Sequence, residues 1–245
     1  MGTVASIHVY DRVEPVAIDA AIDDALGELE RLEQMFSTFR RTSEISRINH
    51  GELNLLDACA EVIEVLDACT WLEHASNGAF SVRRDDGTID PAGFVKGWAA
   101  ERGAARLAAR GLCNFMFSVG GDLMVLGQPA ANERWHVAIA DPLHPGAVAQ
   151  SVEIVDGAVA TSGTAERGHH IRMARGAGDG AESSALASFT VLGPSLTWAD
   201  AFATAAFVMG HDGLGWLEQF QGYQGIAIDL EGAVSTTGGF ADAAV

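Results

Sequence analysis

The sequence has few basic residues: 15 lysines and arginines stand against 33 aspartates and glutamates, and the formal net charge is −18 at pH 7. A chain this acidic repels nucleic acid and anionic membrane surfaces, so general binding to either is excluded. A phosphate-bearing ligand must therefore be held locally, by a cation, a few basic groups or backbone N–H donors.

Cysteine is also scarce. Cys59, Cys69 and Cys113 make an odd count without a CxxC pair, and the first two lie ten positions apart in one expected helix, too far for a disulfide. This indicates a reducing compartment or simply buried thiols.

Long apolar runs are missing too. No run of about 18 apolar residues occurs, so no membrane-spanning helix is expected. The first ten residues, MGTVASIHVY, are typical of a strand and not of a signal peptide. As given, the sequence predicts a cytoplasmic protein, although a longer precursor trimmed at its N-terminus would leave an extracytoplasmic location open.

The 245 residues, 48% of them hydrophobic, suffice for one core, and no repeat or linker divides them. We therefore expect a single domain over 1–245. Helices and strands follow one another without regular βαβ order, which predicts an α+β fold of mixed helices and largely antiparallel sheet. Helices are expected at 16–36, 55–75, 97–109, 198–210 and 213–220, and strands at 4–10, 115–119, 123–126, 135–140, 151–155, 158–161, 187–192, 225–230 and 233–237.

The expected helix WADAFATAAFVMG (198–210) is almost entirely apolar, yet it contains Asp200, and no Lys or Arg follows Ser195. Burying an unpaired carboxylate costs on the order of several kcal/mol. Thr204 lies one turn later on the same helix face, and a carboxylate with a hydroxyl suits Mg²⁺. The alternative is a carboxylate that caps the helix N-terminus, with Thr204 hydrogen-bonded to its own turn.

The stretch DPAGFVKGWA (90–99) indicates a phosphate site. Gly93 lets the backbone approach a ligand, and Lys96 lies at the start of the expected helix, where the N–H groups and the lysine both attract anions. A polar loop with a surface lysine is the alternative.

Two further stretches could carry chemistry. Gly120 and Gly121 interrupt the strand pattern FSVGGDLMVLG (117–127), which indicates a bulge, a close ligand contact or a plain hairpin turn. VATSGTAERGHHI (159–171) places His169 and His170 in a loop after a strand, and histidine can move a proton near neutral pH. In an extended chain only one of the two would enter a pocket. Surface positions are the alternative.

Together and in this order, these stretches resemble the FAD:protein FMN transferases, the ApbE family. The matching segments are MGT at 1–3, FSTFRRTSEISRIN at 36–49, DPAGFVKGWA at 90–99, VGGD at 119–122, ATSG at 160–163, HHI at 169–171 and ADAFATAAFVMG at 199–210. The resemblance implies one ApbE-like (T-fold-like) domain that binds FAD. It also implies Mg²⁺-dependent transfer of the FMN half to a Thr or Ser hydroxyl of a target flavoprotein, with release of AMP.

The resemblance also implies roles for single residues. Asp200 and Thr204 would be Mg²⁺ ligands, helped by the Gly93 carbonyl, and the ion would compensate the buried Asp200. Lys96 would contact FAD and stabilise developing charge, and His170 would accept the hydroxyl proton. The other expected FAD contacts are Met1, Phe39, Ala79, Phe80, Ser81, Asp90, Gly120, Gly121 and Ile171.

The sequence departs from the family pattern in four places. Ser81 replaces an aspartate, Phe39 replaces a tyrosine, RMARGAG replaces the DPRTG turn after HHI, and only RRDDGTI stands where many members carry a longer insert. Two alternatives therefore stay open. Water as the acceptor would make a Mg²⁺-dependent FAD pyrophosphatase that yields FMN and AMP, and loss of acceptor docking would leave a non-catalytic FAD-binding protein.

Overall fold

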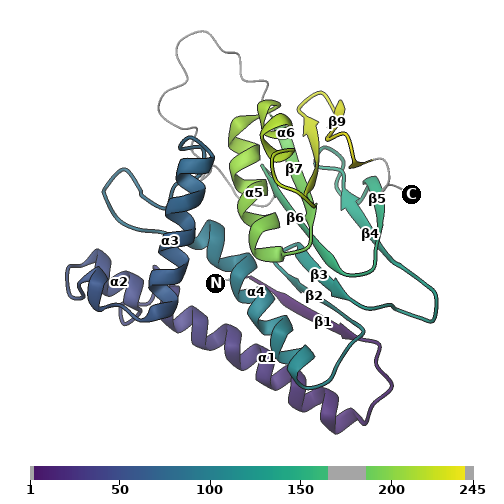
Figure 1. Ribbon diagram of the computed structural model, residues 1–245, viewed down its shortest axis with the longest axis horizontal. Helices are drawn as coiled ribbons and strands as arrows, with labels where there is room; N and C mark the ends of the chain where they lie inside the picture. The colour runs from purple at the N-terminus through teal and green to yellow at the C-terminus, as the bar shows by residue number, and fades with distance from the viewer. Residues whose placement is uncertain (1–2, 165–185, 241–245) are drawn as a thin grey trace.

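A seven-stranded antiparallel sheet forms the centre of the computed structural model, which describes residues 3–164 and 186–240 (Figure 1). The strand order is β1-β2-β3-β6-β7-β8-β9. Their bounds are β1 Ala5–Val9, β2 Phe115–Val119, β3 Asp122–Leu126, β6 Gly157–Gly163, β7 Leu186–Gly193, β8 Gln224–Asp229 and β9 Val234–Thr236. Strands β4 (Trp135–Ala140) and β5 (Val148–Ile154) form a separate antiparallel pair. The predicted α+β class is confirmed.

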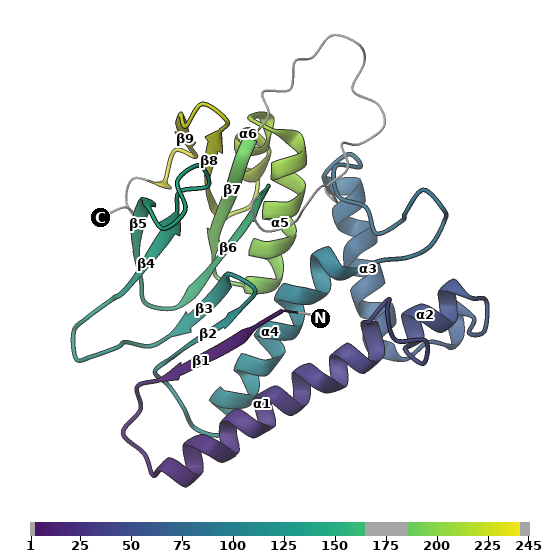
Figure 2. The ribbon, with the colours of Figure 1, turned by 180° about the vertical axis from the view of Figure 1, so that it is seen from behind.

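The helices lie on one side of the sheet (Figure 1). They are α1 Pro15–Phe36, α2 Glu44–Asn49, α3 Ala60–Ala75, α4 Ala92–Ala109, α5 Leu196–Met209 and α6 Asp212–Leu217. Of these, α4, α5 and α6 pack directly on the sheet. Helix α5 packs on β6 and β7, α4 packs on α5 and β2, and α1 lies against α4. Figures 1 and 2 show this layer from both sides. The larger hydrophobic core fills the space between these helices and the sheet.

The β4–β5 pair covers part of the opposite face of the sheet. Trp135, Val137 and Val152 pack there against side chains of β3, β6, β7 and β8 in a second, smaller core. Strand β7 is therefore covered on both sides, and every residue from Leu186 to Leu192 is buried. A strand buried on both faces is typically a near-continuous apolar run, and the sequence LASFTVLG is one apart from the buried Ser188 and Thr190.

Three expectations about the helices were wrong. Helix α4 begins at Ala92 and not at residue 97, and the Asp90 carboxylate accepts a hydrogen bond from the Ala92 N–H at 3.2 Å. Helix α2 forms in a stretch expected to be loop, because the Ser43 hydroxyl caps it by accepting from the Ser46 N–H. The helix expected over 55–75 is divided into a 3₁₀ turn at Leu55–Asp57 and α3.

Cys59, Cys69 and Cys113 are free thiols, and burial raises the pKa of the Cys69 thiol to about 12. Within the described residues, no helix is both long and apolar enough to cross a membrane.

Candidate functional site

The site is built where α4 crosses α5. A Cβ atom on Gly97 would lie 2.6 Å from the Leu196 carbonyl oxygen and 2.9 Å from the Asp200 Cβ, so only glycine allows this approach. The Gly97 N–H donates to the Asp200 Oδ2 at 3.0 Å. Asp200 itself is fully buried. The close crossing therefore brings the backbone of α4 against the one charged side chain of α5.

Lys96 lies between two buried carboxylates. Its Nζ is 3.3 Å from the Asp200 Oδ1 and forms an ion pair with the Asp122 Oδ2. The Asp122 Oδ1 accepts a hydrogen bond from the Thr161 N–H at 2.9 Å. Both carboxylates are 1% exposed, whereas the lysine side chain is 15% exposed and so reaches the surface. We call Lys96, Asp122 and Asp200 the lysine–carboxylate cluster; with two carboxylates and one ammonium, its net charge is −1.

The cluster corrects the expectation that a metal must compensate Asp200. Lys96 supplies the opposite charge from α4, and Gly97 supplies a hydrogen-bond donor. The capping alternative is also wrong, because the N-cap of α5 is Ser195 and Asp200 lies in the second turn. Sequence inspection around Asp200 missed the lysine because it lies on another helix, far earlier in the chain.

Thr204 and Gly93 lie next to one another beside the cluster. A Cβ on Gly93 would be 3.7 Å from the Thr204 methyl carbon and 3.3 Å from the buried Phe80 ring. The Thr204 hydroxyl lies 3.3 Å from the Ser162 hydroxyl, which belongs to the ATSG segment at the end of β6. Helix geometry would direct the Gly97 N–H to the Gly93 carbonyl, so this carbonyl competes with Asp200 for that hydrogen.

These groups form a set of hard oxygen donors: a carboxylate, a hydroxyl and a backbone carbonyl. Such donors suit Mg²⁺. Residues 3–164 and 186–240 contain no group of three or more His, Cys, Asp or Glu side chains that could hold a metal ion. A metal ion bound here would therefore use mixed oxygen ligands, and the residues present fit that requirement.

Gly120 and Gly121 form the two-residue turn between β2 and β3. Both have positive φ angles, 59° and 89°, as a tight hairpin with right-handed twist requires. Val119 pairs directly with Asp122 across this turn. The hairpin alternative is thus confirmed, and the turn places Asp122 at the cluster. Contact of the two glycines with FAD stays a prediction.

The other predicted contacts on α4 and before it vary in exposure. Asp90 forms an ion pair with Arg84 at the start of α4. Phe80 is buried against Gly93, Ala79 is half-buried, and Ser81 is exposed, its hydroxyl accepting from the Arg83 N–H at 3.1 Å. Phe80 is thus the member of the GAFS segment that reaches the neighbourhood of Thr204.

Four predicted residues are not brought to the cluster by the described chain. Phe39 is 96% exposed in the loop between α1 and α2, so it contributes almost nothing to packing within the described residues. Met1, His170 and Ile171 lie outside the described residues. Their expected roles stay predictions.

Sequence reasoning missed two residues of the site, Asp122 and Ser162. Each follows or belongs to a segment that was singled out: Asp122 comes directly after the paired glycines, and Ser162 is part of ATSG. A charged residue at the first position of a strand flanked by apolar residues was the available signal for Asp122.

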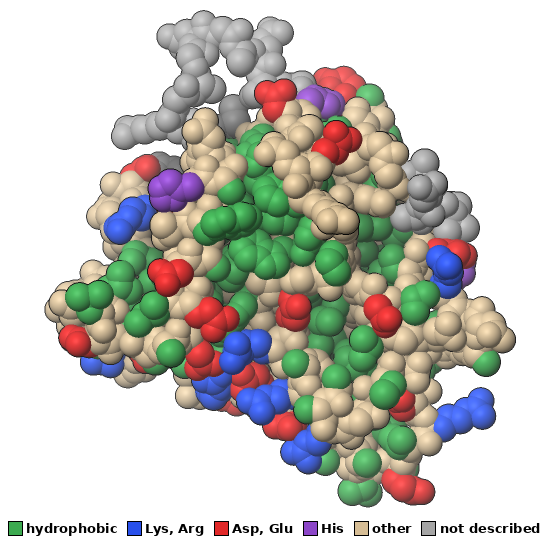
Figure 3. Space-filling view, viewed as in Figure 1, with side chains coloured by type: hydrophobic (Ala, Val, Ile, Leu, Met, Phe, Trp, Pro, Cys, Tyr) green, Lys and Arg blue, Asp and Glu red, His purple; other side chains and the backbone are tan. Residues whose placement is uncertain are grey.

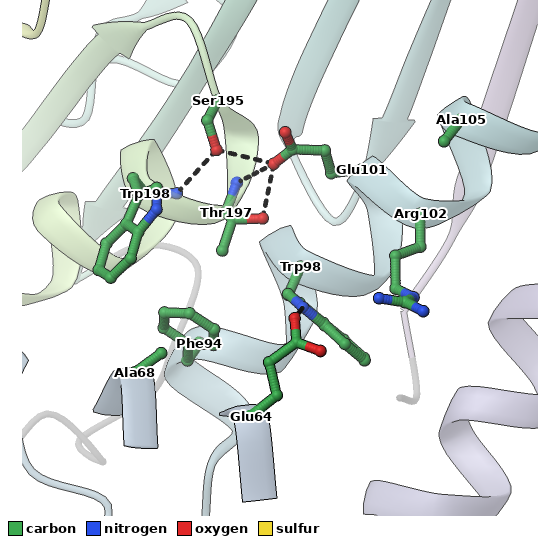
Figure 4. Close-up of a pocket in the computed structure, with 10 residues that line it drawn as sticks. All are labelled: Glu64, Ala68, Phe94, Trp98, Glu101, Arg102, Ala105, Ser195, Thr197 and Trp198. Atoms are coloured by element: carbon green, nitrogen blue, oxygen red, sulfur yellow. Dashed lines mark hydrogen bonds between the residues drawn. The ribbon is translucent and has the colours of Figure 1, made fainter. Parts of the chain in front are cut away.

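A separate pocket of about 490 Å³ lies on the opposite face of α4 (Figure 4). Helical spacing places Phe94, Trp98 and Glu101 on this face, away from Lys96. The Glu101 Oε2 accepts hydrogen bonds from the Ser195 hydroxyl at 2.8 Å and from the Thr197 N–H at 2.9 Å, so it caps α5. The apolar surface in Figure 3 extends over the region between α3 and α5. Glu101, which lines this pocket, therefore fixes the start of α5.

Comparison with known proteins gives one family. A model described as the ApbE family matches residues 1–84 and 81–227. Two curated relatives are named FAD:protein FMN transferase. One, from Vibrio cholerae serotype O1, is 27% identical over 62% of this chain and 48% of its own length. The other, from Treponema pallidum, is 31% identical over 63% of this chain and 47% of its own length. The chain thus spans about half the length of the curated relatives it matches.

Solved structures share the fold. The ApbE protein from Thermotoga maritima superposes with a TM-score of 0.80 at 21% identity, covering 98% of this chain and 95% of that one. The Pseudomonas stutzeri flavinyl transferase ApbE, in its apo form, gives a TM-score of 0.78 at 19% identity, covering 99% and 98%.

Proposed function

The chain belongs to the ApbE family, and we propose that it transfers the FMN half of FAD to a Thr or Ser hydroxyl of a target flavoprotein, releasing AMP. The observation that carries the proposal is the convergence of Lys96, Asp122 and Asp200 from α4, β3 and α5 in one buried cluster. Buried charges cost free energy, and they are common where a site must bind or move charge.

We propose that Asp200, Thr204 and the Gly93 carbonyl hold Mg²⁺. When bound, Mg²⁺ supplies positive charge that neutralises pyrophosphate oxygens. The net charge of −1 on the lysine–carboxylate cluster favours binding of a divalent cation. The whole chain has a net charge of −18 and repels anions, so an anionic ligand needs such a cation to bind. Lys96, which reaches the surface, adds a second cationic group on the same side of α4.

The proposed reaction is a displacement at phosphorus. The acceptor hydroxyl oxygen forms a bond to the FMN-side phosphorus, the bond from that phosphorus to the bridging oxygen breaks, and AMP leaves with that oxygen. His170 takes the proton of the acceptor hydroxyl. Lys96 stabilises negative charge that develops on the phosphoryl oxygens, and positioning contributes the rest, as in other phosphoryl transfers.

One incubation separates this function from the two alternatives. Purified protein is mixed with FAD and MgCl₂, alone or with a peptide that carries an acceptor Thr, and a peptide with Val at that position is the matched control. Transfer requires AMP release and, on the Thr peptide only, a mass gain equal to FMN minus one water. FMN and AMP without peptide would show a pyrophosphatase, and bound, intact FAD in every arm would show a binding protein; either result contradicts the proposal.

A further inference from the structure

We infer that Asp122 is a positioning residue that keeps Lys96 in place when a divalent cation takes Asp200. The inference rests on the proposed function, because it requires a cation at Asp200. It adds a role for a residue that neither sequence reasoning nor the donor set of the site assigns. Asp122 would act through the lysine and not as a ligand.

The two carboxylates of the cluster are arranged alike. The Asp200 Oδ2 receives the Gly97 N–H at 3.0 Å, and the Asp122 Oδ1 receives the Thr161 N–H at 2.9 Å. Each carboxylate therefore has one oxygen anchored to a backbone donor, which fixes its orientation, and its second oxygen turned toward the Lys96 Nζ.

The lysine is shared, and only one of its two carboxylates belongs to the donor set. The Asp200 Oδ2 already accepts the Gly97 N–H, so a cation bound by Asp200 would compete with Lys96 for the Oδ1. If Lys96 depended on Asp200 alone, the cation would have to displace a largely buried ammonium from its counter-ion, which is costly. Because the Asp122 Oδ2 is in contact with the Nζ, Lys96 keeps a negatively charged counter-ion when Asp200 binds the cation.

The position of Asp122 suits this role. It is the first residue of β3, held by the two-glycine turn and by the neighbouring strand β6, so its carboxylate sits on the sheet and not on the helix that carries Asp200. Lys96 can thus keep its position when Asp200 binds a cation, and its ammonium would remain available to an anionic ligand.

The test is the affinity for Mn²⁺ alone, measured by EPR or calorimetry without FAD. Asp122→Asn keeps an acceptor for the Thr161 N–H but removes the charge, and we expect the Kd for Mn²⁺ to rise by about 10-fold or more, as for other residues that support a ligand. In a Lys96→Gln background the same change should alter the Kd by less than about twofold, because its effect passes through the lysine. An equal factor in both backgrounds would show that Asp122 attracts the cation directly, without the lysine, and would overturn the inference.

A crystal structure of the wild-type protein with Mn²⁺, with and without FAD, gives a second readout, and it decides the matter if Lys96→Gln does not fold. We expect anomalous density for Mn²⁺ at Asp200 and Thr204, with the Lys96 Nζ still on Asp122. Mn²⁺ at Asp200 together with Asp122 as a further ligand, or with Lys96 turned away from Asp122, overturns this inference and leaves the proposed metal site standing. No Mn²⁺ at Asp200 in either crystal overturns both.

Discussion

Gly97 donates its backbone N–H to the Asp200 carboxylate at 3.0 Å, across the crossing of α4 and α5. The contact exists because α4 carries no side chain at the crossing point: a Cβ on Gly97 would lie 2.6 Å from the Leu196 carbonyl oxygen. Helix packing and the orientation of a buried charge are therefore set by one residue.

Gly97→Ala tests this crossing. We expect the free energy of unfolding to fall by about 2 kcal/mol or more, because overpacking outweighs the roughly 1 kcal/mol that alanine gains in a helix. Gly27→Ala on α1 is the matched control: nothing lies within 4 Å of its added Cβ, so that variant should become slightly more stable. Urea unfolding of both variants checks the pair, and equal stabilities would contradict the crossing as described.

Lys96→Ala should affect both stability and FAD affinity. Without the ammonium, two buried carboxylates face one another, and we expect a loss of about 3–5 kcal/mol together with weaker FAD binding. Arg110→Ala, which breaks an exposed ion pair with Asp24 (3.0 Å), should cost less than about 1 kcal/mol and leave FAD binding as it is. Urea unfolding and a fluorescence titration with FAD measure the two effects; unchanged FAD affinity in Lys96→Ala would remove the lysine from the binding site.

Asp200→Ala should abolish metal-dependent turnover, with a loss of about 100-fold or more in AMP release at saturating FAD. The reason is that the helix then offers Thr204 but no charge to a cation. Asp23→Asn, an exposed carboxylate on α1, is the control. Rates are compared across a MgCl₂ series, and full activity in Asp200→Ala would refute its assignment as a ligand.

His170→Ala should lower FMN transfer by about 100-fold, as expected for loss of a proton acceptor, while FAD binding remains. The neighbouring His169→Ala is a control of the same chemistry, since the family resemblance assigns the role to His170 and not to His169. Mass spectrometry of the acceptor peptide gives both rates. If the two variants behave alike, His170 has no special role.

Glu28 should make stability fall in acid. Its carboxylate is buried on α1. It accepts hydrogen bonds from Arg31 at 2.8 Å and from Arg106 at 3.0 Å, and these lower its pKa from 4.5 to about 2. A lowered pKa means that the stabilisation is complete above pH 4.5 and is lost as the pH falls toward 2. Glu28→Gln should therefore lower the free energy of unfolding at pH 7 by about 1–2 kcal/mol, a modest value because solvent screens the half-exposed arginines. The free energy of unfolding of this variant should fall less between pH 7 and pH 3 than that of the wild type. Glu30→Gln, exposed on the same helix, should follow the wild type in urea unfolding at pH 7, 4 and 3.

Periodic segments were predictable from the sequence, and contacts between them were not. The apolar rhythm of α1 and the alternation in β2 and β4 identify these elements within a few residues, because their burial follows a local period. The start of α4 was misplaced because the helix begins directly after Pro91, where the Asp90 carboxylate accepts from the Ala92 N–H. Helix α2 was missed because six residues offer little periodicity.

The sequence motifs identified many of the residues of the site, but they did not predict how these residues contact one another. The structure brings Asp200, Thr204, Gly93 and Lys96, which the motifs singled out, close together, and their roles toward Mg²⁺ and FAD stay predictions. The ion pair of Lys96 with Asp122 and Asp200 depends on how a hairpin and two helices pack, and no local pattern records that. Phe39 shows that a matching motif does not by itself place a side chain in the site. Its side chain packs on almost nothing within the described chain.

The Asn49 side chain binds the backbone of Ile89 in both directions: it donates to the carbonyl at 2.8 Å and accepts from the N–H at 2.7 Å. Residues 83 and 89 also form an isolated bridge. Residues 83–89 thus form a hairpin loop that is closed at its base, directly before Asp90 and the first turn of α4. Its tip, residues 84–88, can consequently lengthen or shorten during evolution without shifting Gly93 or Lys96, and added length there costs little because closure entropy grows slowly.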